Sequence, residues 1–262
     1  TSDGQPHEIK GLTAGATYTL REVTPADGYV TAADQKFQIT AADGSVTSVT
    51  MKDDPTKYAF YKVDEDGAAL SGAVLEVRSR KGTVIDRWTT DGSAHTIEGK
   101  LIVGQKYTLH EVSAPANYAV ADDISFTVPD SSALQKITMT NKLKRVDFTF
   151  TKTSFTKTPL AGTTFDLYYC YDQTPGHTHS TLTSTSTGCW QMFDTQTSDA
   201  NGSLTFSELI ATRTYALIEK KATDGQQLAS GYWLITYDER TGNSDTDWTV
   251  TPVGTELNMD FY

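Results

Sequence analysis

The sequence predicts an all-β protein made of repeated small domains, and three observations support this prediction. Strand-favouring Thr, Val and Tyr are abundant, and the turns are rich in Asp-Gly and Asn-Gly pairs. No long segment keeps the period of an amphipathic helix. A motif of the form Tyr-x-Leu-x-Glu occurs three times, ending at Glu22, Glu111 and Glu219. The recurrence of one strand-like motif indicates several copies of one β-domain.

The spacing between the motifs sets the size of the repeated domain. Glu22 and Glu111 are 89 positions apart, and the tyrosines that follow them, Tyr29 and Tyr118, keep the same spacing. This period fits one small β-domain. We expect a complete domain at 55–143, the C-terminal part of a preceding domain at 1–54, and a longer domain at 144–262.

Composition and charge restrict the function of the chain. The 262 residues are 37% hydrophobic, enough for two or three small cores, and no apolar run approaches membrane-spanning length. The formal net charge of -11 argues against a nucleic-acid-binding surface, which needs clustered Lys and Arg. No nucleotide-binding loop, hydrolase triad or pair of catalytic carboxylates is present, so we expect no cofactor and no enzymatic turnover. No signal peptide or sorting motif is present either, which we interpret as a mature fragment of a larger protein.

In the middle copy, the glutamate of the motif is predicted to point into the core. Side chains alternate along a strand, so Tyr107, Leu109 and Glu111 project to one face. Burial penalises a charged carboxylate, so this glutamate needs a partner or a proton. A protonated carboxyl in an apolar site is a group that general acid and base chemistry uses. A strand-end glutamate that reaches solvent is the simpler interpretation of one copy, and three copies in register favour the inward one.

Two further polar residues of the middle copy are predicted to point inward. Lys62 lies on the same face of the first strand as Phe60, and Asn141 on the same face of the last strand as Met139. A lysine amine whose charge is disfavoured by apolar surroundings can attack the carboxamide carbon, while Glu111 polarises the amide and carries the proton to the departing ammonia. The product is an intramolecular isopeptide bond. A buried hydrogen-bonded network without covalent chemistry fits the spacing equally well.

The same residues carry a resemblance to a known family. The middle copy contains an aromatic-x-Lys-x-Asp strand from Phe60 to Asp64, a Leu-x-Gly-Ala strand start, the Tyr-x-Leu-x-Glu motif followed by Pro and Tyr, and a terminal Met-Thr-Asn. This arrangement resembles the Cna B-type domain of Gram-positive surface adhesins and pilins, and the resemblance covers the whole chain. It implies tandem immunoglobulin-like β-sandwiches on a sortase-anchored protein. It assigns Lys62 as the nucleophile, Asn141 as the acceptor and Glu111 as the catalyst of an isopeptide bond.

The two flanking copies match only part of this site. In the first copy, Glu22 and Asp53 match the catalyst and the acceptor, and the strand that brings the lysine would lie before the first residue. In the third copy, Lys152 and Glu219 match the nucleophile and the catalyst, and strand parity places the acceptor just past the last residue. We therefore expect one isopeptide bond within the chain.

The third copy contains an insertion at about 168–192 that holds the two cysteines of the chain, Cys170 and Cys189. We predict a disulfide that closes this loop, as suits a protein outside a reducing cytoplasm. Zinc binding by both cysteines with His177 and His179 is an alternative, since residues i and i+2 of an extended segment face one way, although the spacing matches no common site. A reactive cysteine like that of thioester adhesin domains is a third interpretation, and no matching glutamine motif follows it.

The repeats and the family resemblance together imply a structural stalk or pilin backbone module, anchored to the cell wall on the outside of a Gram-positive bacterium. Its expected partners are other domains or subunits of the same surface protein or pilus, with no nucleic acid and no membrane insertion. The alternative is an adhesin tip, in which the 168–192 insertion contacts a host protein or glycan. A long exposed loop would favour the tip, and a loop folded onto its own sandwich would favour the stalk.

Overall fold

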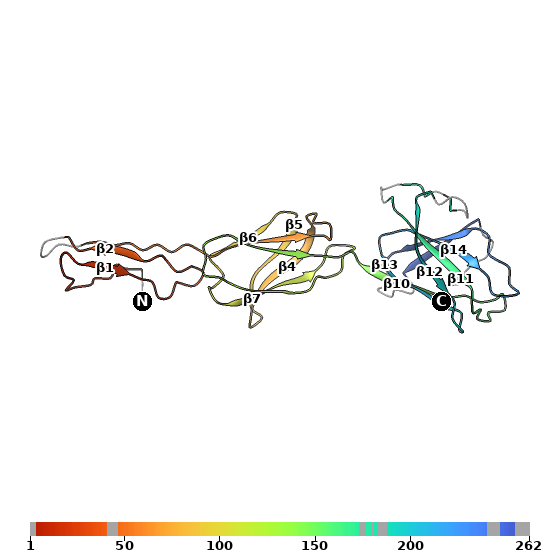
Figure 1. Cartoon of the computed structure of the whole chain (residues 1–262), viewed down its shortest axis with the longest axis horizontal. Coiled ribbons are helices and arrows are strands. Elements are labelled where there is room, and N and C mark those ends of the chain that lie inside the picture. The colour runs from red at the N-terminus through yellow and green to blue at the C-terminus, as the bar shows by residue number, and fades with distance from the viewer. Residues whose placement is uncertain are drawn as a thin grey trace. The chain divides into compact units, whose positions relative to one another are not determined.

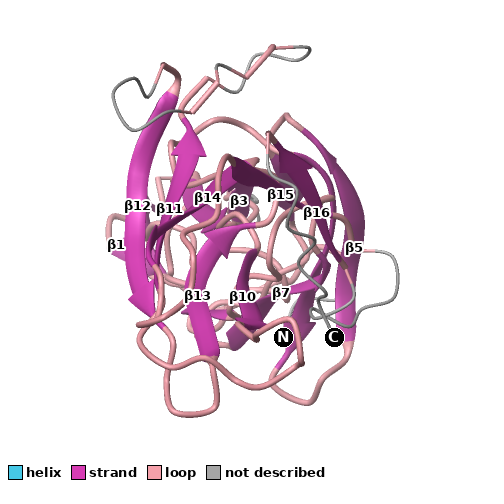
Figure 2. Cartoon of the chain, turned by 90° about the vertical axis from the view of Figure 1, so that its right-hand side faces the viewer, coloured by secondary structure: helices cyan, strands magenta, loops and turns pink. Residues whose placement is uncertain are grey.

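The computed structural model describes residues 4–40, 47–172, 177–179, 181–182, 188–239 and 247–254. These residues form 16 strands joined by turns and loops, and no helix occurs among them (Figure 2). The prediction of an all-β protein is therefore confirmed. Within the described ranges there is no helix that could cross a membrane. The chain divides into two compact units: one comprises Thr1–Ala116 and Val120–Asn141, and the other Asn117–Ala119 and Lys142–Tyr262.

The described residues of the first unit form three sheets (Figure 1). Strands β1 (Thr17–Leu20) and β2 (Gln35–Gln38) make an antiparallel pair. A three-stranded sheet contains, in order, β6 (His95–Glu98), β3 (Lys57–Val63) and β9 (Gln135–Thr140). A four-stranded sheet contains, in order, β5 (Val84–Asp91), β4 (Ser71–Ser79), β7 (Lys106–Ser113) and β8 (Ile124–Thr127).

The two larger sheets of the first unit share one apolar core. Phe60 of β3 and Met139 of β9 come from the three-stranded sheet, while Leu75 of β4 and Leu109 of β7 come from the four-stranded one. All four side chains are buried. Side chains from two sheets that fill one core define a β-sandwich. Burying a large apolar side chain stabilises a fold by about 1.5–3 kcal/mol, so this core holds the first and last strands of the sandwich in place.

The first and last strands of this sandwich, β3 and β9, are hydrogen-bonded neighbours and run parallel. Lys62 is the partner of Met139 in this register, and the backbone N–H of Asn141 donates to the carbonyl oxygen of Val63 at 3.0 Å. Because paired parallel strands end at the same edge of a sheet, the C-terminal ends of β3 and β9 lie together. This edge is where the lysine and asparagine of the predicted reacting set are found.

The residues before β3 are attached to the sandwich through close backbone contacts at Gly28. The carbonyl oxygen of Gly28 accepts hydrogen bonds from the backbone N–H of Thr56 at 2.9 Å and from its hydroxyl at 3.1 Å. Gly28 has a φ of +88°, and a Cβ at this position would lie 2.1 Å from the carbonyl oxygen of Gly99. Glycine fits here because it tolerates the left-handed backbone and has no Cβ to collide.

The described residues of the second unit form two sheets (Figure 1). Strands β10 (Arg145–Thr151) and β13 (Ser203–Ile210) make an antiparallel pair. A five-stranded antiparallel sheet contains, in order, β12 (Trp190–Thr197), β11 (Thr164–Cys170), β14 (Tyr215–Lys221), β15 (Tyr232–Tyr237) and β16 (Trp248–Val253).

The five-stranded sheet buries apolar side chains on both of its faces. Along β11, Phe165 and Leu167 belong to the main core, which also contains Phe148 of β10. Cys170, on the opposite parity of β11, belongs to a smaller second core with Trp190. The alternation of side chains along a strand explains this division into two faces. Both units thus contain β-sheets packed on apolar cores, and the predicted tandem β-sandwich fold is confirmed.

Candidate functional site

Three polar side chains meet inside the first unit at the edge where β3 and β9 end. The Nζ of Lys62 lies 3.2 Å from Oε1 of Glu111, and Nδ2 of Asn141 donates to Oε2 of the same carboxyl at 2.7 Å. The side chains of Lys62 and Glu111 are 1% and 0% exposed, and Asn141 is 0% exposed as a whole residue. One carboxyl group therefore contacts an amine and a carboxamide at once, and water is excluded from all three groups.

Strand register accounts for this convergence. Along β7, Tyr107, Leu109 and Glu111 are buried while the positions between them are more exposed, as the alternation of side chains predicts. Lys62 takes the inward face of β3, and Asn141 follows directly after β9. Three residues that are far apart in sequence are thus brought together by two strands of one sheet and one strand of the other.

The surroundings of Lys62 favour an uncharged amine. Burial lowers the pKa of Lys62 below its usual value, and the neighbouring Glu111 carboxyl opposes this shift. An uncharged amine has a free lone pair and can act as a nucleophile. The site therefore has the parts for a reaction between Lys62 and Asn141, with Glu111 placed to move a proton between them.

A backbone contact that sequence reasoning missed orients the glutamate in each of the three copies. The Oε2 of Glu111 accepts a hydrogen bond from the backbone N–H of Ala121 at 2.6 Å. The equivalent contacts join Glu22 to Ala32 at 2.7 Å and Glu219 to Ala229 at 2.9 Å. The sequence did contain a signal, because an alanine stands ten positions after the glutamate in every copy. Because Oε2 of each glutamate accepts this backbone hydrogen bond, Oε1 is the oxygen that faces the lysine in the two copies that contain one.

The flanking copies hold incomplete versions of this site. In the third copy, Nζ of Lys152 lies 3.3 Å from Oε1 of Glu219, and the two side chains are 17% and 0% exposed. The acceptor predicted for this copy lies outside the described residues. In the first copy, Glu22 and Asp53 are both half-buried, and within the described part of the chain neither forms an ion pair with a lysine. Among the described residues, the middle copy is the one in which all three residue types come together.

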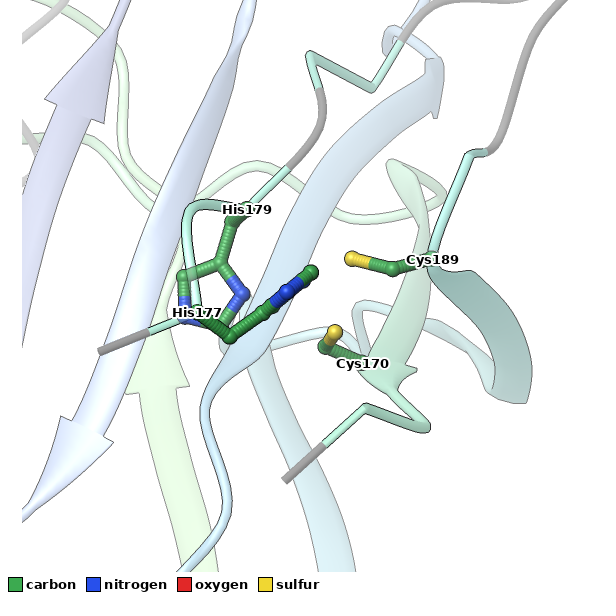
Figure 3. Close-up of side chains that lie close together, drawn as sticks. All are labelled: Cys170, His177, His179 and Cys189. Carbon is green, nitrogen blue, oxygen red and sulfur yellow. The ribbon is translucent and has the colours of Figure 1, made fainter. Parts of the chain in front are cut away.

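The structure gives Cys170 and Cys189 as two buried thiols and not as the predicted disulfide. They lie instead beside His177 and His179, with one ligand atom of each of the four residues within 4.8 Å of the others (Figure 3). These are the same four residues that the sequence suggested as an alternative zinc-binding set. Burial and a hydrogen bond with Cys189 raise the pKa of Cys170 to about 11, which disfavours the reactive thiolate that a thioester-forming cysteine needs.

A family model described as SpaA, prealbumin-like fold domain, matches the chain in three consecutive segments. These segments are residues 1–55, 56–143 and 146–252. The matches therefore cover nearly the whole chain, including the site of Lys62, Glu111 and Asn141. None of the curated proteins compared matches the chain.

Several solved structures are similar to this chain at low sequence identity. The Bacillus anthracis TIE protein is 18% identical, with a TM-score of 0.47, over 86% of this chain and 40% of that chain. A streptococcal ancillary pilin is 22% identical, with a TM-score of 0.33, over 93% of this chain and 75% of that chain. The shaft pilin SpaA from Lactobacillus rhamnosus GG is 17% identical, with a TM-score of 0.31, over 76% of this chain and 98% of that chain.

Proposed function

The chain belongs to the SpaA family of prealbumin-like fold domains, and on this premise we propose that it is a structural stalk segment of a Gram-positive surface protein or pilus. Its repeats are 1–54, 55–143 and 144–262, and the middle one is cross-linked by an isopeptide bond between Lys62 and Asn141. The observation that carries this proposal is the Glu111 carboxyl, which contacts the lysine amine and the asparagine carboxamide in a dry site.

The chemistry proposed for the site is a single amide exchange. The uncharged Nζ of Lys62 attacks Cγ of Asn141, and a new C–N bond forms to this carbon. Glu111 accepts the proton that the amine loses and delivers it to the departing NH2 group, so that the old C–N bond breaks and one ammonia leaves. No oxidant, reductant or cofactor is required. The reaction consumes its own residues and happens once in each molecule.

The position of the bond supports a load-bearing role. Lys62 lies near the end of the first strand of the middle copy, and Asn141 directly after the last. Tension that enters through β3 and leaves through β9 would pass from one strand to the other through the covalent bond. The hydrogen bonds and apolar core of the segment between them would then carry little of the force.

Four buried residues of the 168–192 insertion support the stalk in preference to an adhesin tip, while Tyr171 and Met192 of the same insertion are 64% and 50% exposed. Leu182 is 5% exposed and joins Cys170, Cys189 and Trp190 in the small core on the outer face of the five-stranded sheet. These residues pack on their own sandwich and present little side-chain surface to a host protein or glycan. The wall-anchored, extracellular location and the neighbouring subunits of the same pilus or surface protein remain part of the proposal, based on the family.

Intact-mass measurement of the denatured full chain tests the proposed bond. The expected mass is one ammonia below the sequence mass, and proteolysis should release a branched peptide that joins the segments around Lys62 and Asn141. Reduction of the sample should leave this deficit in place, because an amide bond does not respond to thiols. A chain at its full sequence mass, with the two segments released as separate peptides, would refute the proposal.

A further inference from the structure

We propose that Cys170, His177, His179 and Cys189 form a zinc site that fixes the insertion of the third repeat to its sheet (Figure 3). Two thiolates and two imidazoles are a ligand set that Zn²⁺ favours in structural sites. Ca²⁺ and Mg²⁺ prefer oxygen ligands, so the chemistry of these four side chains points away from them. The site is independent of the isopeptide chemistry, and neither proposal depends on the other.

The distances between the four side chains suit one small tetrahedral ion. Their ligand atoms all lie within 4.8 Å of one another. Zinc bonds of about 2.3 Å to sulfur and about 2.0–2.1 Å to nitrogen place tetrahedral ligands roughly 3.3–3.8 Å apart. Shifts of about 1 Å would therefore complete the coordination, and side-chain rotations of this size need no change of fold. In Figure 3 the two imidazole rings, which come from the segment between the cysteines, approach the two thiols.

His177 is oriented by a carboxylate, as zinc-binding histidines commonly are. Its Nδ1 lies 3.0 Å from Oδ2 of Asp172, which leaves Nε2 as the ligand atom. This Nε2 is buried and has no hydrogen-bond partner among the described residues. A buried nitrogen without a partner is energetically unfavourable, and a metal ion would remove that penalty.

His179 repeats this pattern with a different support. Its Nδ1 is also buried without a hydrogen-bond partner in the described part of the chain. Its ring lies against the indole of Trp190, with ring centroids 5.1 Å apart, and beside the ring of His177 at 5.4 Å. Two neighbouring imidazoles thus each hold an unpartnered nitrogen near the two thiols. This observation is independent of the spacing of the cysteines and itself indicates a missing ligand partner.

The cysteines are held by the most regular part of the second unit. Cys170 is the last residue of β11 and pairs with Trp190, the first residue of β12. The backbone N–H of Tyr171 donates to the carbonyl oxygen of Cys189 at 3.0 Å, which continues the pairing past the strand ends. Both thiols therefore project from a fixed β-ladder, while the histidines come from the segment that the ion would fasten to it.

The charge balance of the site suits its burial. Each thiol releases one proton on binding, so two thiolates and two neutral imidazoles give an uncharged complex with Zn²⁺. An uncharged complex avoids the cost of placing a net charge in an apolar region. The small core around Cys170 and Trp190 would then enclose the ion, and the ion would cross-link the insertion to the sheet, as structural zinc ions do.

The test uses the full chain, purified with a reductant, stripped with a chelator and titrated with Zn²⁺. Elemental analysis after gel filtration should give one zinc per chain, and Co²⁺ should give the visible absorption of a tetrahedral thiolate complex. Cys189→Ser and His179→Ala should each weaken zinc binding by roughly 100-fold or more. Asp172→Asn should weaken it by about 10–100-fold, because this residue only orients a ligand.

Histidine 95 provides a matched control, because its ring also stacks on a tryptophan, Trp88, with centroids 4.1 Å apart. His95→Ala should leave zinc binding unchanged. Thermal unfolding of each variant without metal checks that the sheet is intact. Comparison of His179→Ala with its control His95→Ala tests the site even where the cysteine variant fails to fold. Absence of zinc from the reduced wild-type chain would overturn the proposal. Zinc binding that is retained by all the variants would also overturn it. So would a Cys170–Cys189 disulfide in the chain isolated without reductant, if the reduced chain then takes up no metal.

Discussion

Replacing Glu111 by Gln is expected to leave the middle sandwich folded while abolishing the isopeptide bond. The carboxamide keeps the size of the side chain and can still accept the hydrogen bond from Ala121. It cannot take a proton from Lys62, so the exchange with Asn141 loses its proton carrier. The variant chain should therefore weigh about one ammonia more than the wild type, apart from the small mass change of the substitution itself.

The stability lost with the bond follows from the length of chain that it closes. Lys62 and Asn141 are 79 positions apart. Loop-closure entropy for a cross-link of this span gives about 4.5 kcal/mol at 25 °C, using the relation derived for disulfides. For a domain of this size, the loss corresponds to a fall in Tm of roughly 18–36 °C. Calorimetry of the full chain, read together with intact mass, measures both consequences on one sample.

A double-variant cycle separates the bond from ordinary packing effects. Lys62→Ala removes the same bond as Glu111→Gln. The double variant that carries both changes loses the bond once, so its loss in free energy of unfolding should be about 4.5 kcal/mol smaller than the sum of the two single losses. Glu219→Gln is the matched control, because Glu219 keeps the same backbone contact, to Ala229 at 2.9 Å. It should leave the ammonia deficit unchanged. Strictly additive losses, or a Glu111→Gln chain that still lacks one ammonia, would refute the reasoning.

Three further outcomes follow from the structure. The mass deficit of the 262-residue chain should equal one ammonia, since no lysine before β3 occupies the position equivalent to Lys62, and a second lost ammonia in the mass spectrum would contradict this. In single-molecule pulling, unfolding of the middle copy should lack roughly 260–285 Å of contour length, the span between Lys62 and Asn141, and release of that length would exclude the bond. Gly28→Ala should lower Tm because the new Cβ would lie 2.1 Å from the carbonyl oxygen of Gly99. Gly67 has a similar φ and no atom within 4 Å of a Cβ, so Gly67→Ala should reduce the free energy of unfolding by only about 1 kcal/mol. Equal losses of Tm in the two variants would contradict the close contact at Gly28.

The alternation of side chains made the meeting of Lys62, Glu111 and Asn141 predictable from sequence. A period of two places Lys62, Glu111 and Asn141 inward on their strands, and the shared core then limits where they can meet. The backbone contact of Glu111 with Ala121 was not predicted, because it depends on the path of a loop rather than on a periodic pattern. The alanine at the same distance from each glutamate is a signal that only three aligned copies reveal.

The cysteine and histidine cluster shows where the sequence left two interpretations open, a disulfide and a four-ligand zinc site. Two cysteines outside a reducing compartment favour a disulfide when composition alone is considered, whereas the structure gives both as buried thiols. Residues 171–189 have no strand or helix period from which side-chain directions can be derived. The positions of His177 and His179 depend on packing against Trp190 and pairing with Asp172, which are contacts of the folded loop.

Burial of the lysine distinguishes the second and third copies and bears on when the proposed bond would form. The amine-to-carboxyl distances are nearly equal, 3.2 Å for Lys62 and 3.3 Å for Lys152, yet the side chains are 1% and 17% exposed. Desolvation is the main cause that lowers the pKa of Lys62, and this shift favours the nucleophilic form of its amine. In the middle copy β9 lies directly alongside Lys62, with Met139 as its partner in the register. We infer that this last strand both delivers the carboxamide and completes the exclusion of water, so that the bond closes only once the sandwich has folded.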